Sequence, residues 1–171
     1  NYTNQDGKTY TDISLPLALG GLTKGVTNLE LTNGFATIAN QGLYHPAFFY
    51  TKIVDHDGNV LLDNTMNTDT RQVMKESTAW LLTSAMEDVI LKGTGSRLKF
   101  KKINMPQAGK TGTSTGNRDL WFVGYTPYLT AGIWGGYDSG QKQTSLTYQK
   151  DFWRDTMEKL NQNYTKVSFK K

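Results

Sequence analysis

AGKTGTSTGNRDLWFVGYTPYLTAGIWGGY, residues 108–137, contains three consecutive strand-like runs, at 108–114, 119–126 and 129–137. Links rich in turn-forming residues separate the runs: Thr-Gly-Asn at 115–117 and Thr-Pro at 126–127. Links this short join antiparallel neighbours, because parallel strands need a long crossover connection. The stretch therefore predicts a three-stranded antiparallel sheet.

Helical patterns lie on both sides of this sheet in the sequence. Thr27 and Glu30 fit a capping box, in which each side chain satisfies a free backbone N–H at the start of a helix. An apolar stripe follows, and Gly42 is the predicted stop. The stripe consists of Leu31, Phe35, Ile38 and Ala39. The sequence therefore predicts a first helix that begins after Thr27.

Two further helices and a hairpin complete the predicted elements. A hairpin is expected over 47–62, with Asp57-Gly58 as a two-residue turn. A second helix is expected over 71–91, ended by Gly93. Its predicted apolar face is Leu82, Ala85, Met86, Val89 and Ile90. A last amphipathic helix, with Asp151 as its cap, is predicted from Phe152, Trp153, Thr156, Met157 and Leu160. Helices before and after an antiparallel sheet predict a layered α+β fold.

The composition excludes several classes of protein. With 171 residues, 37% of them hydrophobic and 20% charged, the chain is long and apolar enough for one folded domain with a real core. The net charge of +4 is scattered, which is not typical of a nucleic-acid-binding surface. The absence of cysteine excludes disulfides, thiol catalysis and thiolate metal sites. No apolar run is long enough to cross a membrane, and residues 1–12 do not resemble a signal peptide.

No metal site or cofactor is expected. The run Asp55–Asn59 hints at a calcium loop, but its glycine is at the wrong position, and a hairpin turn explains it better. His45 and His56 have no neighbouring ligand pattern. The aromatic residues of the sheet are expected in the core rather than in a site. These are Trp121, Phe122, Tyr125 and Trp134.

Ser-x-x-Lys, a spacing that brings a hydroxyl beside an amine on a helix, occurs twice. The copy at 96–99 follows a glycine-rich loop and enters a basic run, so its lysine is hard to desolvate. The copy at 139–142 contains a glycine and follows a strand, so a helix is not expected there. Neither serine is expected to be a nucleophile.

Lys110-Thr111-Gly112-Thr113 admits two interpretations. Alternation along a strand places Thr111 and Thr113 on one face and Lys110 on the other. Two hydroxyls and a cation near a strand edge suit an anionic peptide end, which would pair with the edge as an added strand. An ordinary edge strand that carries lysine against aggregation explains the same residues. The spacing alone leaves both open.

The wider sequence resembles the transpeptidase domain of class A, bifunctional penicillin-binding proteins. Lys-Thr-Gly at 110–112 is a signature of penicillin-binding proteins and serine β-lactamases. Four blocks resemble that family in the expected order, most closely its Gram-positive, streptococcus-like members. They are SLPLALGGLTKGVTNLELTNGFATIANQG (14–42), GTG (93–95), GKTGTSTGNRDLWFVGYTPYLTAGIWGGYD (109–138) and FWRD (152–155).

This resemblance implies the β-lactamase/transpeptidase fold, an antiparallel sheet flanked by helices, and a peptidoglycan D,D-transpeptidase. A serine would attack the D-Ala-D-Ala end of a stem peptide, and an amine would resolve the acyl-enzyme; β-lactams would acylate the same serine. Lys110 and Thr113 are the implied catalytic residues: Lys110 supplies positive charge, and the Thr113 N–H is an oxyanion donor. Thr111, Gly112, Thr113 and Ser114 are the implied substrate-binding set.

The chain departs from the family in one respect. The family's first motif lies well over a hundred residues before KTG, Lys110 has only 109 residues before it, and no Ser-x-Asn occurs. Residues 1–171 are therefore expected to be the C-terminal part of the transpeptidase domain and inactive alone. The nucleophile half, a glycosyltransferase domain and a membrane anchor would lie upstream. The expected location is the outer face of the cytoplasmic membrane.

Three alternatives to the transpeptidase stay open at this point. A D,D-carboxypeptidase or a β-lactamase would keep the fold and hydrolyse the acyl-enzyme. A non-catalytic module would use the Lys110 cleft only to hold peptides or β-lactams. The expected partners are the stem peptide, β-lactams and the N-terminal part of the domain, with no nucleic acid.

Overall fold

The computed structural model describes residues 1–65 and 69–171. Its centre is a three-stranded sheet in the order β7-β8-β9, made of β7 (Ala108–Thr113), β8 (Asp119–Tyr125) and β9 (Thr130–Gly136). Both strand pairs are antiparallel, with Thr111 opposite Phe122 and Phe122 opposite Ile133. The predicted antiparallel sheet is confirmed, and β7 is one of its edges.

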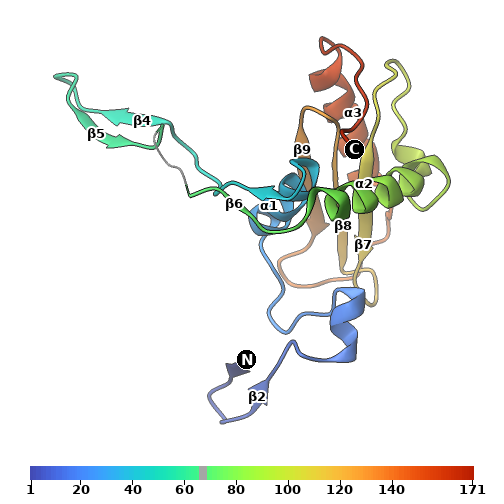
Figure 1. The fold of residues 1–171 in the computed structure, drawn as a ribbon. Helices are drawn as coiled ribbons and strands as arrows, with labels where there is room; N and C mark the ends of the chain where they lie inside the picture. Colours follow the sequence, from blue (N-terminus) through green and yellow to red (C-terminus); the bar gives the residue numbers. More distant parts are fainter. Residues whose placement is uncertain (66–68) are drawn as a thin grey trace.

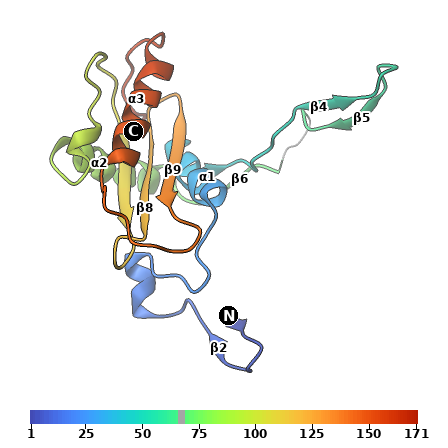
Figure 2. The ribbon, with the colours of Figure 1, turned by 180° about the vertical axis from the view of Figure 1, so that it is seen from behind.

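Helices cover both faces of the sheet (Figure 1, Figure 2). Phe122 packs against Trp153 and Met157 of α3 (Tyr148–Asn161) on one face. Tyr125, which points to the other face, packs with residues of α1 (Asn28–Ala39) and with Met86 of α2 (Glu76–Leu91). The core thus has a helix, a sheet and a helix in layers, as the predicted α+β class requires.

Helix α1 begins where the sequence predicts. The Thr27 hydroxyl accepts the Glu30 N–H at 3.2 Å, and the Glu30 carboxylate accepts the Thr27 N–H at 2.8 Å. The helix lies so close to β9 that a Cβ on Gly132 would come within 2.1 Å of the Thr32 hydroxyl. Gly42, with φ of +84°, follows the helix in the left-handed region that favours glycine.

The start of the second helix was predicted wrongly. Arg71–Gln72 is a strand, β6, which pairs with β3 (Leu43–Tyr44), and the helix begins at Glu76. Its predicted apolar face was also partly wrong, since Leu82 and Ala85 are exposed. The buried residues of α2 are Ala79, Thr83, Met86 and Ile90.

The last helix differs from its prediction in the same way. Trp153 and Met157 are buried, whereas Phe152, Thr156 and Leu160 are exposed. Asp151 lies inside α3, and Thr147 is the residue before its first turn. The buried face instead carries polar side chains, among them Arg154 and Glu158. Tertiary partners, which the helical period alone does not reveal, decide this face.

The predicted hairpin forms from β4 (Lys52–Val54) and β5 (Val60–Asp63) and projects from the body of the protein (Figure 1). Its turn is longer than the predicted two residues: the Asp55 N–H donates to the Asn59 carbonyl, and the Asp55 carboxylate accepts the N–H groups of Asp57 and Asn59. The hairpin turn therefore accounts for the acidic residues that hinted at a calcium loop.

The N-terminal segment also extends from the body (Figure 2). It contains β1 (Tyr2–Thr3), β2 (Thr9–Tyr10) and the short 3-10 helix η1 (Leu15–Leu19). A second 3-10 helix, η2 (Ser96–Leu98), lies between α2 and β7. Among the described residues, no helix is long and apolar enough to cross a membrane.

Candidate active site

The edge of β7 offers backbone groups to a ligand. The Ser114 N–H donates to the Asp119 carbonyl at 3.1 Å, which makes this a hydrogen-bonded pair of the β7–β8 ladder. Hydrogen-bonded pairs alternate along an antiparallel ladder, so Gly112 and Lys110 also bond to β8. The N–H and C=O groups of Thr111 and Thr113 therefore point away from β8, out of the sheet.

Lys110 lies at this edge with its ammonium group exposed. Its Nζ donates to the carbonyl oxygen of Thr111 at 2.9 Å, which agrees with the outward direction of that carbonyl. Thr113 is exposed, and Thr111 is half-buried. The edge therefore presents a cation, two hydroxyls and two outward N–H groups over four residues.

Gly112 keeps the strand close to its neighbour. A Cβ at this position would come within 3.1 Å of the Trp121 Cβ on β8, tighter than ordinary contact. Trp121 is half-buried, and its ring lies 6.5 Å from the ring of Trp134. Trp134 is 37% exposed, so the prediction that the sheet aromatics lie in the core was wrong for this residue, although Phe122 and Tyr125 are buried.

Ser114 closes the turn between β7 and β8. Its hydroxyl donates to a carboxylate oxygen of Asp119 at 2.7 Å and accepts the Asp119 N–H at 2.9 Å. The second oxygen of that carboxylate accepts the indole N–H of Trp134 at 3.0 Å. The proton of Ser114 is thus already engaged, and its substrate-binding role stays a prediction.

A second segment meets the β7 edge at Thr111. The hydroxyl of Thr94, in the loop between α2 and η2, lies 2.9 Å from the hydroxyl of Thr111. The sequence predicted a glycine-rich loop here and included it among the blocks that resemble the family, but it gave Thr94 no role. The two threonines are 17 residues apart, so their contact follows from how the chain returns to the sheet.

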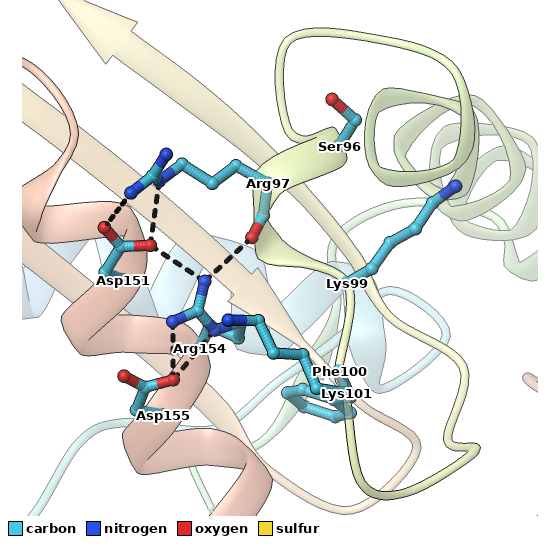
Figure 3. A pocket seen from close by; sticks show the side chains of 8 residues that line it. All are labelled: Ser96, Arg97, Lys99, Phe100, Lys101, Asp151, Arg154 and Asp155. Atoms are coloured by element: carbon cyan, nitrogen blue, oxygen red, sulfur yellow. Dashed lines mark hydrogen bonds and ion pairs between the residues drawn. The ribbon is translucent and has the colours of Figure 1, made fainter.

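Ionic contacts connect the chain after this loop to α3 (Figure 3). Arg97 of η2 donates to both oxygens of Asp151, at 2.8 and 2.7 Å. Arg154, whose side chain is buried, donates to Asp151 and to the Arg97 carbonyl. The hydrogen bond from Arg97 lowers the pKa of the Asp151 carboxyl, assisted by the charges of Arg97 and Arg154.

These residues line a cavity of about 650 Å³ beside η2 and α3. Its two carboxylates pair with its two arginines, and Lys99 and Lys101 also border it, so positive charges outnumber negative ones in its lining. It is bordered by Ser96, Arg97, Lys99, Phe100, Lys101, Asp151, Arg154 and Asp155.

Neither Ser-x-x-Lys copy has the geometry of a nucleophile and its base. Ser96 begins a single turn of 3-10 helix, and Lys99 lies beyond its end. In Figure 3 their side chains point in different directions. Ser139 lies in a turn that Gly140 continues with φ of +65°, so no helix brings it to Lys142. Among the described residues, no group of three or more His, Cys, Asp or Glu could hold a metal ion.

Comparison with known proteins identifies the class. Residues 3–158 match the family described as the penicillin binding protein transpeptidase domain. Penicillin-binding protein 1F of Bacillus subtilis is 36% identical over 141 residues, which cover 81% of this chain and 20% of that protein. Penicillin-binding protein 1A of Clostridium acetobutylicum is 35% identical over 151 residues, which cover 87% of this chain and 18% of that protein.

Solved structures share the fold. The penicillin-binding protein PonA1 of Mycobacterium tuberculosis superposes with a TM-score of 0.80 at 28% identity, covering 98% of this chain and 46% of that one. Penicillin-binding protein 1A of Haemophilus influenzae gives a TM-score of 0.78 at 20% identity, covering 92% and 29%, and supports the fold alone.

The chain belongs to the transpeptidase family of the penicillin-binding proteins, in its class A branch. It spans about a fifth of the length of the Bacillus and Clostridium relatives. The resemblance expected from the sequence is thereby confirmed, and the predicted fold class with it.

Proposed function

We propose that the protein containing this chain is a peptidoglycan D,D-transpeptidase that acts through a serine acyl-enzyme. The observation that carries the proposal is the β7 edge. There Lys110, Thr111 and Thr113 present a cation, two hydroxyls and outward N–H groups in a chain of the penicillin-binding family. Such an edge suits an extended peptide that ends in a carboxylate, because the peptide can pair as an added strand.

Each edge residue has a role in this proposal. The hydroxyls of Thr111 and Thr113 bind the terminal carboxylate of the stem peptide. The Thr113 N–H is one donor of the oxyanion hole, a kind of contact whose loss typically costs about 3 kcal/mol in the transition state. Lys110 lowers the energy of negative charge in the cleft. Gly112 keeps the strand within reach of the substrate, and Ser114 holds the end of the strand in place.

The reaction transfers an acyl group. The serine oxygen attacks the carbonyl of the penultimate D-Ala, and the bond to the terminal D-Ala breaks, so that D-Ala leaves with the proton. An amine of a second stem peptide then displaces the serine and forms the cross-link. Penicillin acylates the same serine when its lactam ring opens.

The nucleophile belongs, in this proposal, to a part of the longer protein outside residues 1–171. The chain spans only about a fifth of its relatives, and neither local Ser-x-x-Lys copy lies in a regular α-helix. Residues 1–171 are then the C-terminal part of the transpeptidase domain, inactive alone. We place the domain on the outer face of the cytoplasmic membrane, carried by an anchored parent with a glycosyltransferase domain.

Labelling with fluorescent penicillin tests the proposal. The complete protein, or residues 1–171 together with the remainder of the domain, is expected to be labelled covalently, and residues 1–171 alone are not. Labelling at Ser96 or Ser139 would contradict the placement of the nucleophile. Product analysis with and without an acceptor amine separates a transferase from a carboxypeptidase or a β-lactamase. A protein that binds penicillin without covalent labelling would be a sensing module instead.

A further inference from the structure

We propose that Thr94 is a positioning residue that aims the hydroxyl proton of Thr111 at the carboxylate of the ligand. The inference rests on the proposed function, since it assumes that Thr111 binds a carboxylate. It adds the loop between α2 and η2 as a second element of that carboxylate site. Thr94 would thereby favour ligands that carry a free carboxylate over ligands that do not.

The number of hydroxyl protons fixes the direction of the hydrogen bond between Thr94 and Thr111 when a carboxylate is bound. The Thr94 and Thr111 hydroxyl oxygens lie 2.9 Å apart, and either of them can be the donor. A threonine hydroxyl has one proton, and a carboxylate only accepts. When Thr111 donates to a carboxylate, the bond between the two threonines must run from Thr94 to Thr111. Thr94 then stabilises the productive orientation, and donors in series strengthen one another.

The contact between Thr94 and Thr111 is not needed for the packing of the protein. Its side chain is exposed, so it contributes nothing to the core. The hydroxyl contact with Thr111 is also not needed to satisfy a buried group, because Thr111 is only half-buried and water can reach it. Exposed hydroxyl pairs contribute little to folding because water replaces either partner. The geometry therefore supports a role for Thr94 in orienting the Thr111 hydroxyl.

The backbone of the loop is held firmly enough to position a hydroxyl. The N–H groups of Gly93 and Gly95 both donate to the Val89 carbonyl, at 3.1 and 3.0 Å. A Cβ on Gly95 would come within 3.0 Å of the Ile90 Cδ1 and 3.1 Å of the Val89 carbonyl oxygen. The loop therefore lies directly on the end of α2, and a side chain at position 95 would require Val89 or Ile90 to shift.

Helix α3 holds the other side of the loop. Lys150 Nζ donates to the Thr94 carbonyl at 3.5 Å. Two residues after Gly95, Arg97 of η2 pairs with both oxygens of Asp151 (Figure 3). The Arg154 guanidinium also binds the Arg97 carbonyl at 3.2 Å. Thr94 is thus fixed between α2 and α3, and both helices also pack on the sheet that carries Thr111.

The test compares ligands with and without a carboxylate in the complete protein. We would measure second-order acylation rate constants with benzylpenicillin and with its methyl ester for wild type, Thr94→Val and Thr94→Ser. Thr94→Val is expected to slow acylation by benzylpenicillin about 5-fold, the effect of losing one hydrogen bond between neutral groups, and acylation by the ester less than about 2-fold. Thr94→Ser keeps a hydroxyl and is expected to stay close to wild type.

Two further variants make the result specific. Thr144→Val changes an exposed threonine in the loop before α3 and is expected to leave both rates unchanged. Thr94→Val added to Thr111→Val is expected to have little further effect, because the group that Thr94 orients has gone. Thermal unfolding of each variant checks that the domain is folded.

The outcomes are distinct. If Thr94→Val lowers the acylation rate constants for benzylpenicillin and its methyl ester equally, or lowers neither, the proposed role of Thr94 is wrong. It is also wrong if the Thr94→Ser variant is as slow as Thr94→Val. If instead the wild-type protein is not acylated by benzylpenicillin at all, the proposed function itself fails, and this inference fails with it.

Discussion

The ring of Phe122 in β8 meets the ring of Trp153 in α3 edge to face, with ring centroids 4.8 Å apart and planes at 76°. Both side chains are buried, and the Trp153 indole N–H donates to the Ala131 carbonyl of β9 at 2.9 Å. Aromatic pairs of this geometry stabilise a core by about 1 kcal/mol in addition to the contribution of the apolar area that they bury. This contact therefore joins the helix to the sheet whose edge forms the candidate site.

Gly109→Ala is expected to lower the free energy of unfolding by about 1–3 kcal/mol, as overpacking of a core does. A Cβ at this position would lie 2.6 Å from the Phe122 Cζ and 2.7 Å from the Val123 carbonyl oxygen, so Phe122 would have to move against Trp153. Urea denaturation of the complete domain measures the change.

Gly34→Ala is the matched control for this prediction. Gly34 lies in α1, and nothing is within 4 Å of an added Cβ. Because alanine has the higher helix propensity, the variant's free energy of unfolding is expected to rise by up to about 1 kcal/mol. Equal effects of the two substitutions would contradict the packing that we describe.

Thr113→Val is expected to reduce the rate of acylation by benzylpenicillin about 10- to 100-fold, the usual effect of losing a hydrogen bond to a charged group. The variant keeps the backbone N–H that the oxyanion hole requires, so the loss isolates the hydroxyl. Acylation kinetics of the complete protein give the result, with Thr144→Val as the control. An unchanged rate would remove Thr113 from the carboxylate site.

Glu158→Ala is expected to destabilise the domain by about 1.5–3 kcal/mol. One oxygen of this buried carboxylate accepts the N–H of Lys101 at 2.5 Å and that of Ile103 at 3.3 Å, and it also accepts the N–H of Lys102. Removing it leaves these amides without their acceptor. Urea denaturation is the measurement, and Glu158→Gln, which keeps a carbonyl oxygen, should lose less.

Lys159→Ala, on the exposed side of α3, is the control for helix propensity. Its free energy of unfolding should stay within about 0.5 kcal/mol of the wild-type value. If Lys159→Ala were as destabilising as Glu158→Ala, the three amide contacts would not be the cause.

Tyr125→Phe is expected to change the response of stability to alkaline pH. Burial raises the pKa of the Tyr125 hydroxyl to about 12, against a smaller opposite effect of its hydrogen bond with Thr83. The raised pKa means that the folded state keeps a proton that the unfolded state loses above about pH 10. The contribution of the Tyr125 hydroxyl to the free energy of unfolding is therefore complete below pH 10, and it falls as the pH rises towards 12.

The Phe variant lacks this titration. Near neutral pH its free energy of unfolding should be about 1 kcal/mol lower, because the variant loses the buried hydrogen bond between the Tyr125 and Thr83 hydroxyls, whose oxygens lie 2.7 Å apart. Urea midpoints of both proteins from pH 8 to 11 test the prediction. If the difference in urea midpoint between wild type and the Phe variant does not narrow as the pH rises, the folded state does not raise the pKa of Tyr125.

The sequence alone predicted the elements that depend on neighbouring residues. Thr27 and Glu30 form the expected capping box because both groups belong to one helical turn. The three strands after residue 107 have nearly the predicted bounds, since short links leave antiparallel pairing as the available arrangement. The sequence also indicated the family, and with it the Lys110 edge, through motifs that lie close together in the chain.

The tertiary structure decided which faces are buried and which distant residues meet. Leu82 and Phe152 were predicted on buried faces but are exposed. Arg154 is buried because it pairs with carboxylates of α3 and with a carbonyl of η2, and Glu158 is buried because backbone N–H groups after η2 donate to it. Arg71–Gln72 forms a strand because Leu43–Tyr44 lies beside it. The contact of Thr94 with Thr111 likewise requires α2, α3 and β7 to be packed together. Burial and long-range hydrogen bonds depend on the partner surface, which a local pattern does not specify.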